Sequence, residues 1–155
     1  MPTARRTAVV TLVAAATLAA ATTVVVVTAP PPVTPVAMPP DDAPPEQVVD
    51  AYTRALAGHD CATAGALRTP GDEPTWCADL AALTDVHVGE PTVEDPRYSG
   101  HSPDQEVTYV PVTFDLDTRP FHGDGSMPEG ATTWGYLLVR DADGDPWRIV
   151  DEGVG

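Results

Sequence analysis

Hydrophobic and polar residues follow two different periods along residues 46–155. In Glu46–Ala57 the apolar residues recur at i, i+1, i+4, i+7 and i+8, which predicts an amphipathic helix. Two prolines precede this segment and Gly58 follows it, as at the ends of many helices. Asp60 is suited to cap a second short helix over Cys61–Leu67, and a third short helix is predicted near residues 76–80.

From residue 86 onward the period falls to two, as in half-buried strands. Strands are predicted at 86–93, 105–117, 132–140 and 147–151, with a hairpin turn at Asp141–Pro146. Helices followed by antiparallel strands define an α+β domain, in which the N-terminal helices pack on one face of a curved antiparallel sheet. The alternation predicts a core made of Leu56, Val110, Val112, Phe114, Leu138 and Ile149.

The first 29 residues differ from the rest of the chain. Arg5 and Arg6 precede the uncharged 23-residue segment Thr7–Ala29, which as a helix is long enough to span a ~30 Å hydrocarbon core. The positive flank orients the N-terminus inward and the remainder outward. We expect residues 1–29 to form a transmembrane anchor that holds the domain outside the cell membrane. Two small-residue sites leave open a cleaved signal peptide and a secreted product.

Residues 30–45 are rich in proline. Such a composition predicts an extended, semi-rigid linker without a packed element. We expect this linker to hold a domain at residues 46–155 away from the membrane.

The domain is strongly acidic. All 23 acidic residues of the chain lie beyond residue 40, together with only six of its eight basic residues, which gives this part a net charge of −17. Such a field repels nucleic acid and anionic lipids and favours cations or basic partners, so we expect no nucleic-acid partner. The same charge also keeps an exported protein soluble.

Cys61 and Cys77 are the only cysteines in the sequence. In an exported protein an isolated pair predicts a disulfide, and a loop of about 16 residues contributes roughly 3 kcal/mol in the chain-entropy model. The competing interpretation is a metal site that adds His59, Asp60 and His87, although zinc ligands usually occur in closer pairs. We expect the disulfide, with no metal and no other cofactor.

A second metal-like pattern lies near the C-terminus. Asp141, Asp143, Asp145 and Glu152 match positions 1, 3, 5 and 12 of a calcium-binding loop, but position 6 is proline where the template has glycine. A hairpin turn with positive φ at Gly144 accounts for the same residues. We expect the turn.

The order of these elements resembles the nuclear transport factor 2-like (cystatin-like, polyketide cyclase-like) superfamily, and in particular small exported bacterial members of unassigned function. The similarity spans Pro45–Gly155 and is carried by Val49–Tyr52 with Leu56, the pair Cys61 and Cys77, Trp134–Val139 and Trp147–Gly155. It implies a cone between helix and sheet, where isomerase-like members hold a carboxylate base with tyrosine or acid donors. The superfamily also contains non-catalytic binding and assembly domains, so the fold does not assign an activity.

The candidate pocket residues are aromatic or acidic, namely Tyr52, Tyr109, Asp115, Trp134 and Tyr136. A desolvated aspartate beside a tyrosine can act as a base, but the alternation places Asp115 on the strand face opposite Phe114. We therefore expect a non-catalytic extracytoplasmic binding or scaffold domain, with a small ligand or a protein as its partner. The alternative is an isomerase- or cyclase-type enzyme that uses a carboxylate base in the cone.

Overall fold

The computed structural model describes residues 30–74, 76–122 and 129–153, and the residues from Pro32 onward form one structural unit. The predicted anchor at 1–29 lies outside the described residues. In the part of the chain that is described, no helix is long and apolar enough to cross a membrane.

Two helices come first, α2 (Pro45–Ala57) and α3 (Cys61–Ala66). Helix α2 begins at a proline, where a helix needs no backbone N–H. The predicted cap of α3 is confirmed, because the Asp60 carboxylate accepts a hydrogen bond from the backbone N–H of Thr63 at 3.2 Å. The prediction of a third short helix is wrong. Residues 76–79 form turns, and from Leu80 the chain is extended because it pairs with residues 112–118 of another strand.

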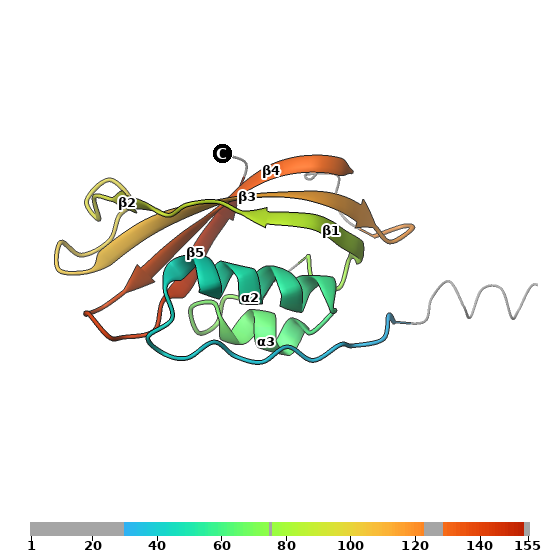
Figure 1. The fold of residues 1–155 in the computed structure, drawn as a ribbon, viewed down its shortest axis with the longest axis horizontal. Helices are drawn as coiled ribbons and strands as arrows, with labels where there is room; N and C mark the ends of the chain where they lie inside the picture. The colour runs from blue at the N-terminus through green and yellow to red at the C-terminus, as the bar shows by residue number, and fades with distance from the viewer. Residues whose placement is uncertain (1–29, 75, 123–128, 154–155) are drawn as a thin grey trace, which may run out of the picture. The chain divides into compact units, whose positions relative to one another are not determined.

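The strands form one antiparallel sheet: β1 (Leu80–Val88), β2 (Thr92–Glu94), β3 (Glu106–Thr118), β4 (Gly130–Arg140) and β5 (Arg148–Gly153). Strands β1, β3, β4 and β5 lie in that order, and β2 pairs with the other half of the β3 edge that β1 occupies. Both helices lie on one face of the sheet (Figure 1), which confirms the α+β class. The first predicted strand proves to be two, since the chain leaves the sheet between Val88 and Thr92.

The core lies between α2 and the sheet. All six residues predicted for it are at most 2% exposed, which confirms the assignment of faces. The hairpin turn between β4 and β5 is also confirmed, with a φ of +89° at Gly144.

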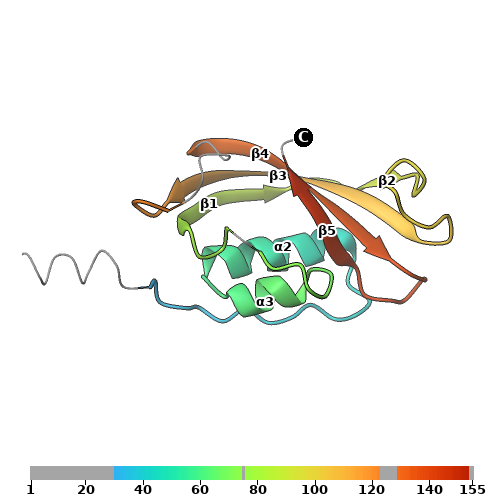
Figure 2. The same ribbon diagram turned by 180° about the vertical axis from the view of Figure 1, so that it is seen from behind.

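The proline-rich segment lies on the helices. Residues 34–43, here called the strap, run along the side of α2 and α3 that faces away from the sheet (Figures 1 and 2). The backbone N–H of Thr34 donates to the Gly58 carbonyl at 2.7 Å, and that of Val36 donates to the Asp60 carboxylate at 3.0 Å. The segment is extended, as predicted, but the strap is not a free spacer because polar groups at the helix ends bind its backbone.

A disulfide joins Cys61 in α3 to Cys77 in the turn before β1, with the two Cα atoms 5.8 Å apart. The predicted disulfide is confirmed, so neither sulfur is available as a thiolate ligand. Within the described ranges, no group of three or more His, Cys, Asp or Glu side chains could hold a metal ion.

Candidate functional site

Five polar or aromatic side chains from distant parts of the chain meet between the helices and the sheet. This set, called the Arg68 cluster below, consists of Tyr52 from α2, Arg68 after α3, Trp76 from the turn before β1, Tyr136 from β4 and Glu152 from β5. Tyr52 and Tyr136 lie in the core, where the periodicity of α2 and β4 directs them inward. Arg68 and Glu152 are charged, and each is buried only because the other is its partner.

A β-bulge in β5 turns Glu152 toward the core. Leu138 pairs with Ile149, and Tyr136 pairs with Glu152, so two steps along β4 correspond to three along β5. The extra residue shifts the alternation by one position, as bulges do. Without it, Asp151 would face the helices and Glu152 would face solvent.

The Glu152 carboxylate accepts three hydrogen bonds. Its donors are Arg68 Nη1 at 2.7 Å, Tyr52 Oη at 3.1 Å and Trp76 Nε1 at 3.2 Å. Arg68 is 6% exposed, and its Nε also donates to the Asp72 carboxylate at 3.0 Å. The cluster therefore pairs a buried cation with a carboxylate whose acceptor sites are largely occupied.

Burial and charge act in opposite directions on this ion pair. Burial raises the pKa of Glu152 above its ordinary value, and the Arg68 charge with the hydrogen bonds from Trp76 and Tyr52 offsets part of that rise. Burial is the largest single influence on the pKa of Arg68 and lowers it, but the negative charge of Glu152 together with the contacts to Tyr52 and Asp72 outweighs burial, so the pKa is raised and the guanidinium stays charged. Burial, reinforced by Glu152, also raises the pKa of the Tyr52 hydroxyl, which remains protonated.

Two buried polar groups on β4, one of them in this cluster, lack a hydrogen-bond partner among the described residues. They are the hydroxyl of Tyr136 and the indole N–H of Trp134, two residues apart on the inner face of β4. Leaving a buried polar group unpaired costs about 1–3 kcal/mol.

The five residues predicted to share a pocket are divided between the two faces of the sheet. Tyr52 and Tyr136 contact each other in the core, with ring centroids 5.4 Å apart, and Trp134 is also part of the core. Tyr109 lies against Gly135 on the opposite face, which it shares with Asp115. Each of these two borders a separate shallow depression, of about 230 and 280 Å³.

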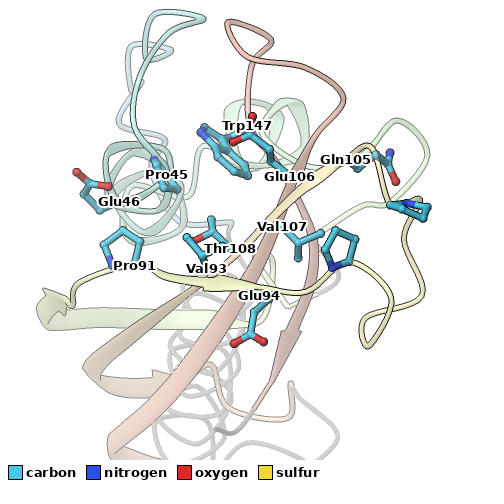
Figure 3. Close-up of a pocket in the computed structure, with 12 residues that line it drawn as sticks. Pro45, Glu46, Pro91, Val93, Glu94, Gln105, Glu106, Val107, Thr108 and Trp147 are labelled. Carbon is cyan, nitrogen blue, oxygen red and sulfur yellow. The ribbon is translucent and has the colours of Figure 1, made fainter.

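A larger groove, of about 550 Å³, lies between the N-terminal end of α2, strand β2 and the residue before β5 (Figure 3). We call it the Val93 groove. Its lining is mainly proline, valine and tryptophan, with three glutamates and no basic residue. The lining residues are Pro45, Glu46, Pro91, Val93, Glu94, Pro96, Pro103, Gln105, Glu106, Val107, Thr108 and Trp147.

One wall of the Val93 groove is held in place by charge. Glu106 accepts a hydrogen bond from Arg140 Nη2 at 2.7 Å, and the Arg140 guanidinium lies 4.7 Å from the centre of the Trp147 ring. The opposite side carries Val93, whose side chain is 86% exposed. No sequence pattern predicts this groove, because its residues come from four separate segments, 45–46, 91–96, 103–108 and 147, whose periodicities are unrelated.

Comparisons with known proteins identify no relative: no protein-family model, no curated protein and no solved structure matches this chain.

Proposed function

We propose that this chain is a non-catalytic, extracytoplasmic binding domain of the nuclear transport factor 2-like superfamily, tethered to a membrane through residues 1–29. One observation carries the proposal. The only carboxylate of the Arg68 cluster is engaged by three donors, while the Val93 groove is open on the surface.

A general base must accept a proton from its substrate, and so needs an accessible lone pair. Glu152 is 13% exposed and its carboxylate already accepts from Arg68, Tyr52 and Trp76. Taking up a proton would weaken the ion pair with Arg68. These contacts favour a structural role for the carboxylate, in which it joins α2, β5 and the turn before β1.

The Val93 groove has the properties of a binding site. Ligand sites are usually concave, of about 300–1,000 Å³, and lined by apolar residues with a few polar groups. The groove fits that volume and composition. Its apolar residue Val93 is exposed on a strand, where no other described side chain covers it.

Site-specific photo-crosslinking in the native host tests the binding function without knowledge of the partner. A photoreactive amino acid replaces Val93 in one strain and Asp117, an exposed residue of β3 that does not line the groove, in another. We expect a crosslinked adduct from position 93 and none from position 117. Equal adducts at both positions, or none at 93, would contradict the proposal.

The proposed location has its own test. If residues 1–29 anchor the domain, the protein sediments with membranes and resists extraction by high salt, because an anionic domain is not held there by charge. Recovery of the protein from the medium with a new N-terminus after residue 21 or 29 would show a cleaved signal peptide. A cytosolic protein with reduced Cys61 and Cys77 would contradict both forms of export.

One observation favours an enzyme of the isomerase or cyclase type as a second candidate. The unpartnered hydroxyl of Tyr136 lies across the β4–β5 pair from Glu152, a carboxylate whose pKa burial raises, and the unpartnered indole N–H of Trp134 is two residues away along β4. A small molecule bound there should shift the Trp134 indole N–H signal in an NMR spectrum. It should leave the backbone signals of β2 unchanged, which distinguishes it from a ligand of the Val93 groove.

A further inference from the structure

We propose that the Val93 groove binds a basic segment of another protein, in which apolar side chains contact the groove floor and arginine or lysine side chains pair with the glutamates around it. This inference builds on the proposed binding function and identifies the class of partner.

Charge is the first argument. Glu46, Glu94 and Glu106 all border the groove, and none of its twelve lining residues is basic. Arg140 neutralises Glu106, whereas no cationic partner is found for Glu46 or Glu94 in the described part of the chain. In Figure 3 the carboxylate of Glu94 points away from Val93 and Thr108, and that of Glu46 lies beyond Pro45, so cations would bind at the margin of the groove and not on its floor. The surrounding domain, with its excess of 17 negative charges, strengthens the attraction.

Shape and hydrophobicity are the second argument. The buried residues Val107 and Thr108 form the floor, and the Trp147 ring forms one side (Figure 3). A small ligand is usually enclosed over most of its surface, but this groove is open along Val93, which is 86% exposed. An open apolar groove suits a segment that remains attached to a larger body.

A second copy of this chain does not fit the groove. Two domains that each carry about 17 negative charges repel one another. Their arginines are also largely engaged: Arg54, Arg68, Arg97 and Arg140 each form an ion pair within their own chain. The occupant therefore has to bring its own cations.

Three amidated pentapeptides serve as probes of the purified full-length protein in neutral detergent. One alternates arginine with leucine, the second glutamate with leucine, and the third arginine with serine. Binding is followed by NMR titration of the backbone amides of the protein. We expect the first peptide to shift signals of β2 and of the N-terminal end of α2, the second to have no effect, and the third to bind at least about fivefold more weakly, because it lacks the apolar contact.

Matched variants locate the binding site. Glu46→Gln and Glu94→Gln should each lower the affinity for the arginine–leucine peptide roughly two- to fivefold, as expected for exposed ion pairs. Asp117→Asn removes the same charge away from the groove and should leave binding unchanged. Val93→Ser should weaken binding by about fivefold without altering the far-UV circular dichroism spectrum.

Several outcomes would overturn the inference. They are equal binding of the acidic peptide, equal binding of the serine peptide, equal effects of Glu94→Gln and Asp117→Asn, or no binding of any peptide. In each case a crosslink from position 93 in the native host would still support the proposed binding function, with a partner of another chemistry. Absence of that crosslink would contradict the proposed function itself.

Discussion

Replacing Arg68 by methionine tests whether the Arg68 cluster holds the fold together. The change keeps an unbranched side chain but removes the guanidinium that binds Glu152 and Asp72. Asp72 is 44% exposed, so water replaces its lost contact at little cost. Glu152 is 13% exposed and would remain as a buried carboxylate without its cation. Breaking a buried pair in this way typically costs about 3–5 kcal/mol, a large fraction of the ~5–15 kcal/mol stability of a domain.

The cost should depend on pH in a defined direction. Without Arg68, burial acts on Glu152 with less opposition and raises its pKa in the folded state further above the value in the unfolded chain. A carboxyl group with a raised folded-state pKa binds more protons when folded, so stability falls as the pH rises from the unfolded to the folded pKa. The difference between Arg68→Met and the wild type is therefore largest at pH 7 and decreases as the pH is lowered toward about 4.

Urea denaturation at pH 7 and pH 5, followed by circular dichroism, measures both effects. The double variant Arg68→Met with Glu152→Gln should be more stable at pH 7 than Arg68→Met alone, because no buried charge is left unpaired. Arg97→Met is the matched control, since Arg97 is 74% exposed and its loss should leave the free energy of unfolding close to that of the wild type. A cost for Arg68→Met that is below about 1 kcal/mol, or that is the same at both pH values, would refute the buried ion pair.

Three further predictions concern packing and the disulfide. Phe114→Ala should cost about 3–5 kcal/mol in urea denaturation, because the ring is 2% exposed; a change below 1 kcal/mol would mean that Phe114 does not face the core. Changing Cys61 and Cys77 together to serine opens a loop with a sequence separation of 16 and should cost about 3 kcal/mol, and a reducing agent should then have no further effect on the melting temperature. Gly135→Ala should cost about 1–3 kcal/mol, since a Cβ there would overlap the Tyr109 ring; the same cost in a Tyr109→Ala background would show that the ring is not the cause.

Local pattern was sufficient for most of the fold. The period of two in β3 identified Val110, Val112 and Phe114 as core residues, because an antiparallel strand with one buried face must alternate. The same rule correctly placed Asp115 on the other face. The start of β1 was missed because Leu80–Asp85 follows no clear alternation. Two features interrupt the alternation in this part of the strand. Asp85 has a left-handed φ of 50°, and the pairing with β3 shifts register between Thr84 and His87.

The Arg68 cluster could not be predicted from alternation, because the orientation of Glu152 depends on the β-bulge in β5. Alternation from Ile149 predicts that Glu152 faces solvent, and the extra residue in β5 reverses this. Arg68, which follows a short helix, carried no signal of burial, since arginines are rarely buried without a partner. The two charges are buried together because each supplies the partner that the other needs, and this relation joins positions 84 residues apart.

The position of the strap also depends on residues that are distant in the sequence, and Gly58 shows this. Gly58 is the C-terminal cap of α2, as predicted, but its φ of −86° is one that any residue can adopt, and the left-handed φ of 54° falls on His59. A Cβ at Gly58 would lie 2.6 Å from the carbonyl oxygen of Thr34, closer than packed atoms come. Glycine is therefore required at this position because the strap crosses there. The proline-rich composition predicted an extended chain correctly, but whether that chain is free or bound depends on the partners it meets. Here those partners are the Gly58 carbonyl and the Asp60 carboxylate, which make the strap a part of the helical layer.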